Sequence, residues 1–277
     1  MKQKGKMIIS TIMGQKISPD LWMKWIRENG FDQIDFYGCF PLYSPFSYKD
    51  PQMRKERLLG WTKRLRKEQL HVFSYTPEMR NFPLNLADIN EEIRKETVTY
   101  CERALEDGVS LEAEYVRVNG GYRYLGLPRE RVFDQLCRSM EILLNKAEKE
   151  NICILIGPED WDTTNVLDGC HQTASLFEKF QSPYLKIQLN GNLFLEGKEP
   201  AAWYRHLFGG NIKAMGVRLQ AEEFDTELKM LKEADSLLER IPWIAEIEGE
   251  NSMARFMASI KESICRLGNN LGGDIQE

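Results

Sequence analysis

Acidic side chains gather at two places where a short apolar run of the sequence ends. They are Glu159, Asp160 and Asp162 after one run, and Glu246, Glu248 and Glu250 at the end of another. Carboxylate oxygens are the ligands that Mg²⁺ and Ca²⁺ prefer, so these residues could form an all-carboxylate metal site. The alternative is that acidic loop residues face water or cap the next helix.

Eight apolar runs along the chain each predict a strand. They lie at residues 7–12, 33–37, 71–76, 113–118, 153–156, 185–189, 212–219 and 243–247. Apolar residues at helical spacing predict helices between them. These begin at Pro19, at Asp88 and behind Pro128, and lie over residues 54–67, 172–180, 201–207, 225–240 and 252–267. Asp88 with Glu91 has the form of a capping box.

The alternation of strand and helix predicts a closed barrel. A (β/α)₈ barrel needs about 250 residues and this strand order. An open doubly wound sheet is the competing fold, but no G-x-G-x-x-G or P-loop motif follows the first strand. We therefore expect an α/β fold, a single (β/α)₈ TIM barrel over residues 1–270, with a flexible tail at 271–277. Its chemistry should lie at the carboxyl ends of the strands.

Composition narrows the class of partner. The net charge of -5 argues against nucleic acid as the main partner, and the Lys/Arg-rich stretch at 54–67 has the spacing of a solvated helix face. No run approaches the roughly 20 apolar residues of a membrane span. The six cysteines have no paired spacing, which is typical of a reduced intracellular protein. We expect a cytoplasmic protein with no nucleic-acid or membrane partner.

Four segments carry a resemblance to a known family. They are GFDQIDFYG (30–38), YTPE (75–78), NLAD (85–88) with Arg94, and YVRVNGG (115–121). In this order they resemble the xylose isomerase-like TIM barrels, in the sugar isomerase/epimerase branch that includes ketose 3-epimerases and fructoselysine 3-epimerase. The resemblance runs from the first strand through the fourth helix and, more faintly, to Glu246.

The resemblance implies a metal site. In this family a glutamate after the fifth strand, an aspartate after the sixth, a histidine on the seventh and a glutamate on the eighth hold a divalent metal, usually manganese. The metal polarises a sugar carbonyl while two glutamates move a proton on the adjacent carbon.

This chain departs from that pattern at three of the four positions. The expected positions fall on Gly157, Asn190, Gly216 and Glu246, so only the last is retained. The three histidines, His71, His171 and His206, are not expected at the catalytic end of the barrel. We therefore predict a degenerate site without a metal cofactor, with manganese or magnesium on atypical ligands as the alternative.

A cation from the protein itself could replace the metal. Arg218 lies two residues beyond Gly216 and therefore on the same strand face. The hypothesis is that Arg218 pairs with Glu246 in place of the ion, with Arg117 as a second cation nearby. The alternative is an arginine that covers the rim.

Further polar and aromatic residues follow the predicted strands, and sugars bind through rings and fixed hydrogen bonds. Glu246 and Glu159 are the candidate catalytic residues. The candidate substrate-binding residues are Tyr37, Tyr75, Glu78, Arg117, Asn119, Gln188, Asn190 and Arg218. Other rings near the mouth are Phe40, Tyr43, Tyr122, Tyr124, Trp161 and Phe194, which could equally close the barrel or meet another subunit.

Several functions stay open. The first is an isomerase/epimerase-like protein that binds a small carbohydrate or sugar derivative at the C-terminal mouth of the barrel without the family's metal, with or without catalysing a reaction on it. The others are an active sugar isomerase or epimerase with atypical ligands, a partner subunit of an active homologue, and a metal-free lyase or dehydratase using Glu246 with Tyr75 or Glu78. The family resemblance also suggests a homo-oligomer that pairs through the mouth loops.

Overall fold

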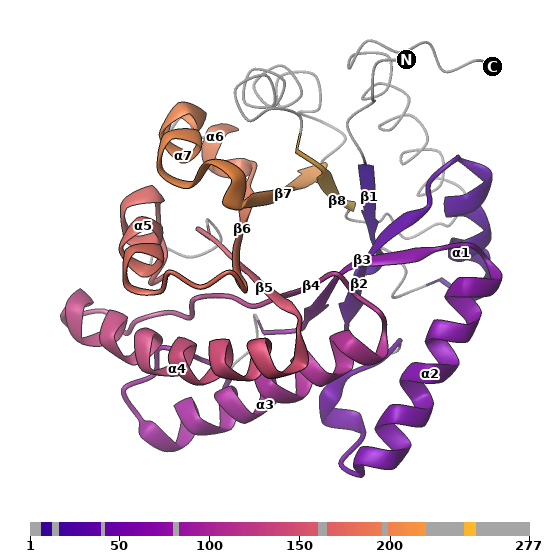
Figure 1. The fold of residues 1–277 in the computed structure, drawn as a ribbon, viewed down its shortest axis with the longest axis horizontal. Helices are drawn as coiled ribbons and strands as arrows, with labels where there is room; N and C mark the ends of the chain where they lie inside the picture. The colour runs from indigo at the N-terminus through magenta and orange to yellow at the C-terminus, as the bar shows by residue number, and fades with distance from the viewer. Residues whose placement is uncertain are drawn as a thin grey trace.

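Eight parallel strands close into a barrel in sequence order, as Figure 1 shows. The computed structural model describes residues 7–12, 17–39, 42–79, 83–159, 165–195, 199–219 and 241–247. The strands are β1 (Met7–Ser10), β2 (Gln33–Gly38), β3 (His71–Pro77), β4 (Tyr115–Arg117), β5 (Cys153–Ile156), β6 (Leu185–Asn190), β7 (Ile212–Leu219) and β8 (Trp243–Ile247). All eight predicted strands are confirmed, although β1 ends earlier and β4 begins later than predicted.

Helices connect the strands and cover the outside of the barrel (Figure 1). They are α1 (Pro19–Glu28), α2 (Pro51–Lys67), α3 (Glu91–Ser110), α4 (Arg129–Glu150), α5 (Cys170–Lys179), α6 (Asn192–Leu195) and α7 (Ala201–Phe208), with short 3₁₀ turns at Pro45–Ser47 and Gly209–Asn211. The predicted helices at 225–240 and 252–267, and the predicted tail at 271–277, lie outside the described residues. Among the described helices, none is long and apolar enough to cross a membrane.

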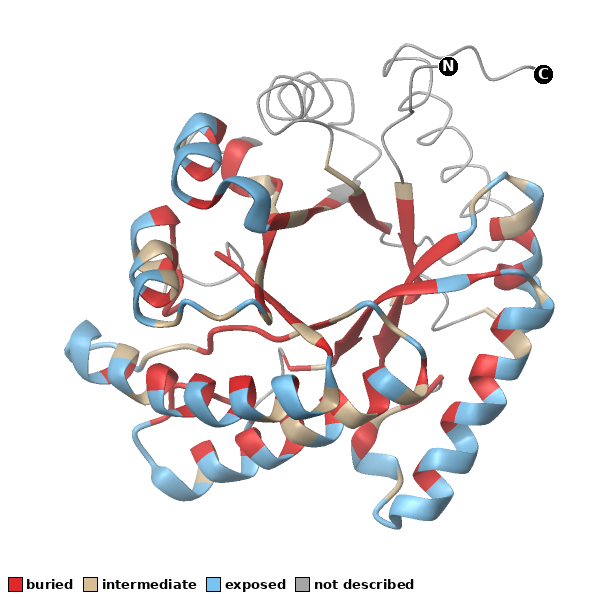
Figure 2. Cartoon of the chain, viewed as in Figure 1, coloured by how far each residue is buried: buried red, intermediate tan, exposed pale blue. Residues whose placement is uncertain are grey.

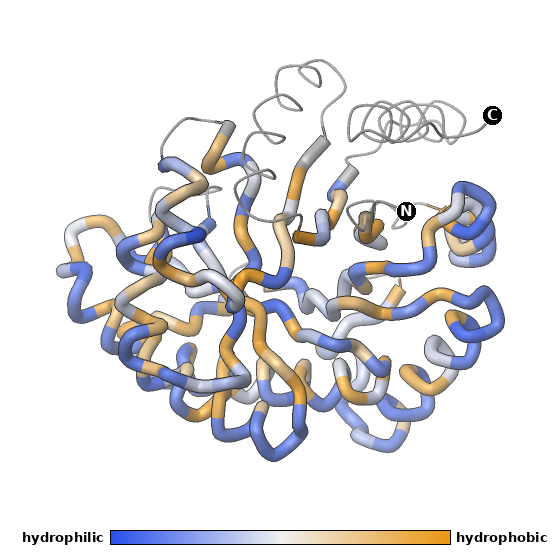
Figure 3. Tube along the Cα trace, turned by 45° about the horizontal axis from the view of Figure 1, so that its top comes forward, coloured by the Kyte–Doolittle hydropathy of each residue, from blue (hydrophilic) through white to orange (hydrophobic). Residues whose placement is uncertain are grey.

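Each long helix turns an apolar stripe toward the strands. In α2, Leu58, Trp61 and Leu65 are buried at helical spacing. The Trp61 ring meets Phe36 of β2 edge to face at 5.5 Å, which holds this helix against the barrel. Figure 3 shows the same alternation of hydrophilic and hydrophobic residues along the helices, and Figure 2 shows that their buried residues face the strands.

A smaller apolar cluster fills the inside of the barrel. It consists of Ile8, Phe73, Leu155, Ala214 and Ile244. Because side chains alternate along a strand, the inward positions after Ile8, Ala214 and Ile244 are Ser10, Gly216 and Glu246. The apolar cluster therefore lies inside the barrel directly below the polar residues at the carboxyl ends of the strands.

The start of α3 differs from the predicted capping box at Asp88 and Glu91. Asn90 is the capping residue, because its side chain accepts a hydrogen bond from the backbone N–H of Glu92 at 3.0 Å. The Asp88 carboxylate instead accepts from the backbone N–H of Asn90 at 2.7 Å and from the Tyr124 hydroxyl at 3.2 Å. Asp88 therefore stabilises the turn that precedes the helix.

Candidate functional site

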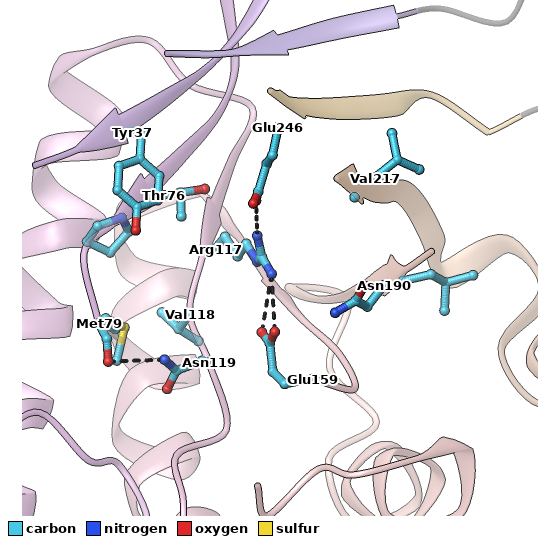
Figure 4. A pocket seen from close by; sticks show the side chains of 13 residues that line it. Tyr37, Thr76, Met79, Arg117, Val118, Asn119, Glu159, Asn190, Val217 and Glu246 are labelled. Carbon is cyan, nitrogen blue, oxygen red and sulfur yellow. Dashed lines mark hydrogen bonds and ion pairs between the residues drawn. The ribbon is translucent and has the colours of Figure 1, made fainter. Parts of the chain in front are cut away.

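A cavity opens at the carboxyl ends of the strands, where a TIM barrel carries its chemistry (Figure 4). Strands β2, β3, β4, β6, β7 and β8 and the segment after β5 all contribute to its wall. The lining residues are Tyr37, Thr76, Pro77, Met79, Arg117, Val118, Asn119, Glu159, Leu189, Asn190, Gly216, Val217 and Glu246.

Arg117, the last residue of β4, bridges two glutamates at this mouth. Its Nη1 donates to Glu246 Oε1 at 3.2 Å, and its Nη2 lies 3.3 and 3.4 Å from the two carboxylate oxygens of Glu159. Figure 4 shows the guanidinium between the two carboxylates. The exposed fractions of the side chains are 19% for Arg117, 9% for Glu159 and 10% for Glu246. Arg117, Glu159 and Glu246 therefore form a largely desolvated group of one cation and two anions in the described part of the mouth.

The charge on Arg117 is secured by its neighbours. Burial opposes the charge, but Glu159, Glu246 and Asp35 outweigh burial and raise the pKa of Arg117 above its ordinary value. An arginine is already protonated at any physiological pH. The guanidinium is therefore a permanent positive charge facing the cavity.

Asp35 of β2 lies beneath this arrangement and was not among the predicted site residues. Its carboxylate accepts hydrogen bonds from the hydroxyls of Ser10 at 2.8 Å and of Ser74 and Thr76 at 2.7 Å each. Complete burial raises the pKa of Asp35, and the negative charge of Glu246 adds to the rise, while the three hydroxyls oppose it. Asp35 thereby fixes the Thr76 side chain at the cavity wall. An acidic residue inside the apolar run at 33–37 was the available sequence signal.

Tyr37 of β2 and Glu78 after β3 are hydrogen-bonded to each other at one side of the cavity. The Tyr37 hydroxyl donates a short hydrogen bond to the Glu78 carboxylate, and the Tyr37 backbone N–H donates to the Thr11 hydroxyl at 2.8 Å. Tyr37 lines the cavity, whereas Glu78 does not. Glu78 therefore orients the tyrosine ring from behind the wall.

The two predicted asparagines line the cavity and shape its loops. Asn119 donates through Nδ2 to the Met79 carbonyl at 3.2 Å and accepts from the Gly121 N–H at 3.1 Å. Asn190 accepts through Oδ1 from the Asn192 N–H at 3.1 Å. These hydrogen bonds of the two side-chain amides fix the backbone where β4 and β6 end.

Two other predicted residues lie outside the cavity lining, and the side chain of a third is not described. Tyr75 is buried in the layer between barrel and helices, with its ring 6.2 Å from Phe36 and 6.4 Å from Tyr43. Gln188 of β6 is buried beside Gly216, behind the cavity wall. The Arg218 side chain is outside the described part of the chain, although its backbone pairs with Glu246 in the register of β7 and β8.

Several other residues predicted near the mouth do not line the cavity, and others are outside the described ranges. The Tyr43 hydroxyl donates to Asp107 of α3 at 2.6 Å, Phe194 packs on Tyr204, and Tyr122 packs edge to face on Tyr124. His171, which was not expected to take part in the site, lies against Trp203 of α7 and does not line the cavity. The residues outside the described ranges are Phe40, Asp160, Trp161, Asp162, Glu248 and Glu250.

The described side chains do not fit the metal that the resemblance implies. A Cβ atom at Gly157 would lie 1.9 Å from the Gln188 carbonyl oxygen, so that position excludes a ligating side chain unless the backbone moves. Gly216 supplies no ligand, and Asn190 offers a neutral amide whose oxygen already accepts from the Asn192 N–H. Glu246, like the nearby Glu159, binds the Arg117 guanidinium. Within the described ranges, no group of three His, Cys, Asp or Glu residues is placed to hold an ion.

Comparisons with known proteins agree with this barrel. Fructoselysine 3-epimerase of Escherichia coli O157:H7 is 21% identical over 158 residues, which are 57% of this chain and 56% of that protein. The matched part thus spans little more than half of that relative. A crystal structure of D-psicose 3-epimerase in the presence of D-fructose superposes with a TM-score of 0.75 at 11% identity, covering 97% of this chain and 100% of the other.

A second solved structure gives the same result. L-ribulose 3-epimerase superposes with a TM-score of 0.75 at 13% identity, covering 97% of this chain and 95% of that chain. At these identities the superpositions establish the fold. The profile of the family described as xylose isomerase-like TIM barrel matches residues 23–226, which is more than half of the chain. The protein belongs to the xylose isomerase-like TIM barrel family.

Proposed function

We propose that this protein binds a small carbohydrate or sugar derivative at the mouth of the barrel and does so without a divalent metal. The observation that carries the proposal is the bridge from Glu159 through Arg117 to Glu246 on the cavity wall. A guanidinium and two carboxylates offer both donors and acceptors, which is what the hydroxyls of a sugar require. The Tyr37 ring adds an apolar surface for the C–H face of a sugar.

The relatives support a sugar as the class of ligand. The relatives and solved structures that match this chain include enzymes named for fructoselysine, D-psicose and L-ribulose. Ligands of barrel enzymes bind at the end where the strands terminate, and the cavity lies at that end. A ketose or a ketose derivative is therefore the first ligand to test.

An active isomerase or epimerase is the second candidate, and one feature of the bridge favours it. Such a reaction removes a proton from the carbon next to a carbonyl, which needs a base and a group that stabilises the enediolate oxygen. Glu159 and Glu246 lie on different sides of the Arg117 guanidinium (Figure 4). In this version of the proposal, the glutamates move the proton and Arg117 donates hydrogen bonds to the oxygen.

A ketose titration tests the proposal. D-fructose, D-psicose, D-tagatose and L-ribulose are titrated by calorimetry into purified protein, and incubated mixtures are analysed for interconversion of the sugars. We expect saturable binding of at least one ketose, weakened in Arg117→Met and in Glu246→Gln. Interconversion that is lost in Glu246→Gln would select the enzyme, and binding without interconversion would select the carbohydrate-binding protein. Absence of binding to every ketose would contradict both.

A further inference from the structure

Gln188 is a buried amide for which the described protein supplies no hydrogen-bond partner. The residue is 3% exposed, and neither its side-chain nitrogen nor its side-chain oxygen has a hydrogen-bond partner among the described residues. A buried amide without partners destabilises a folded protein. Such a group in a native structure therefore points to a ligand or an ordered water that is absent from the protein chain itself.

The surroundings of Gln188 indicate where a partner would enter. Its register partner on β7 is Ala214, a member of the apolar cluster inside the barrel, which has no polar group to offer. One inward position higher on β7 is Gly216, which lines the cavity. A Cβ atom at Gly216 would lie 3.0 Å from Gln188 Nε2, and its next neighbour would be the Leu189 carbonyl at 3.7 Å. The missing side chain of Gly216 therefore leaves the amide next to the cavity lining.

The chemistry of the amide selects the ligand group. A primary amide donates through nitrogen and accepts through oxygen, and a hydroxyl does both in return. An anionic group would satisfy only the nitrogen, and an ammonium group only the oxygen. The amide therefore matches neutral hydroxyl groups.

We infer that Gln188 is a specificity-determining residue whose amide hydrogen-bonds with a hydroxyl group of a sugar that reaches past Gly216 to the bottom of the cavity. The inference rests on the proposed function. It adds to that function the residue that hydrogen-bonds with the most deeply bound part of the ligand. Gly216 then serves as the opening, because any larger residue would stand between the sugar and the amide.

The test uses Gln188→Met, which keeps the length of the side chain and removes the amide. We expect it to weaken binding of the best ketose of the panel about tenfold, as the loss of a hydrogen bond to a buried group predicts. The same variant should melt at a higher temperature than the wild type without ligand, because an unpaired amide has been removed. Gly216→Ala is the second variant, and it should weaken the same sugar while Gln188 is intact.

Gln33→Met is the matched control. Gln33 is also buried and its Oε1 also lacks a partner, but it is the first residue of β2, at the end of the barrel opposite the mouth. It should leave the affinity for the ketose unchanged. Monodeoxy analogues give a further readout: one of them should bind the wild type weakly and should bind Gln188→Met as well as the parent sugar does.

The outcomes separate the two proposals. If the wild type binds a ketose and Gln188→Met binds it equally well, the amide contacts only water and the inference fails while the proposed function stands. If the wild type binds no ketose, the proposed function fails and the inference fails with it. Weaker binding in Gln188→Met and Gly216→Ala, but not in Gln33→Met, supports the inference.

Discussion

The Nη2 atom of Arg117 lies 3.3 Å from the Oε1 atom of Glu159. The same guanidinium reaches Glu246 through Nη1 at 3.2 Å, so residues from β4, β8 and the segment after β5 meet through one side chain. In the family that the sequence resembles, a divalent ion is bound by glutamates of both the fifth and the eighth strand and so connects them. Here an arginine makes that connection, and it is part of the fold itself.

Removing the guanidinium should destabilise the protein strongly. Arg117→Met leaves two buried carboxylates without this partner, and breaking a buried ion pair costs about 3–5 kcal/mol. The free energy of unfolding from urea titration measures the loss. Arg66→Met is the control, because Arg66 pairs with Glu112 while 66% exposed, and an exposed pair contributes about 1 kcal/mol or less. Equal losses in the two variants would contradict the assignment of Arg117 as a structural bridge.

Gly157 should tolerate no side chain. In Gly157→Ala the new methyl would meet the Gln188 carbonyl oxygen at 1.9 Å, and we expect a loss of about 3 kcal/mol, at the upper end of overpacking effects. Gly60→Ala in α2 meets nothing within 4 Å and should stabilise the helix by about 0.5–1 kcal/mol. Thermal and urea unfolding of the two variants check both signs. A stable Gly157→Ala protein would show that the fifth-strand position is open to a ligating side chain.

Stability should depend on pH through Asp107 of α3. Burial raises the pKa of Asp107 to about 6, against the opposing effects of the Tyr43 hydroxyl and Arg54. The folded protein therefore binds a proton that the unfolded chain has released, and the contribution of Asp107 to stability falls as pH rises from about 4 to about 6. Asp107→Asn has no such proton. The difference in unfolding free energy between Asp107→Asn and the wild type should rise over this window by about 3 kcal/mol at most, whereas parallel pH curves would contradict the assignment.

The sequence predicted the barrel because each strand has its own apolar run. The predicted bounds of β5, β7 and β8 match the structure, and the pairing of β1 with β8 closes the barrel and excludes the open sheet. Local patterns predicted the site less well. Glu159, Arg117 and Glu246 were all candidates, and Arg117 lies between the two glutamates. Arg218, the cation expected next to Glu246, pairs with it in backbone register, and its side chain is outside the described part of the chain, so that pairing stays a prediction. Period-two alternation ranks residues on one strand and says little about reach across the barrel.

A register shift explains the placement of Tyr75. Between β2 and β3, Ile34 pairs with Val72 and Asp35 pairs with Ser74, so Phe73 is an extra residue on β3. Such a bulge reverses the side on which later side chains lie. Phe73 therefore belongs to the cluster inside the barrel, while Tyr75 belongs to the core under the helices. The shift also directs Ser74 and Thr76 toward Asp35, which the sequence pattern alone did not predict.

Ketose binding in the presence of a chelator tests the central claim most directly. The protein is treated with EDTA, and the best ketose of the panel is titrated before and after one equivalent of Mn²⁺ is restored. We predict the same affinity in both titrations and a loss of at least about tenfold in Arg117→Met, because the guanidinium supplies the positive charge at the mouth. Binding that disappears with EDTA and returns with Mn²⁺ would contradict the account.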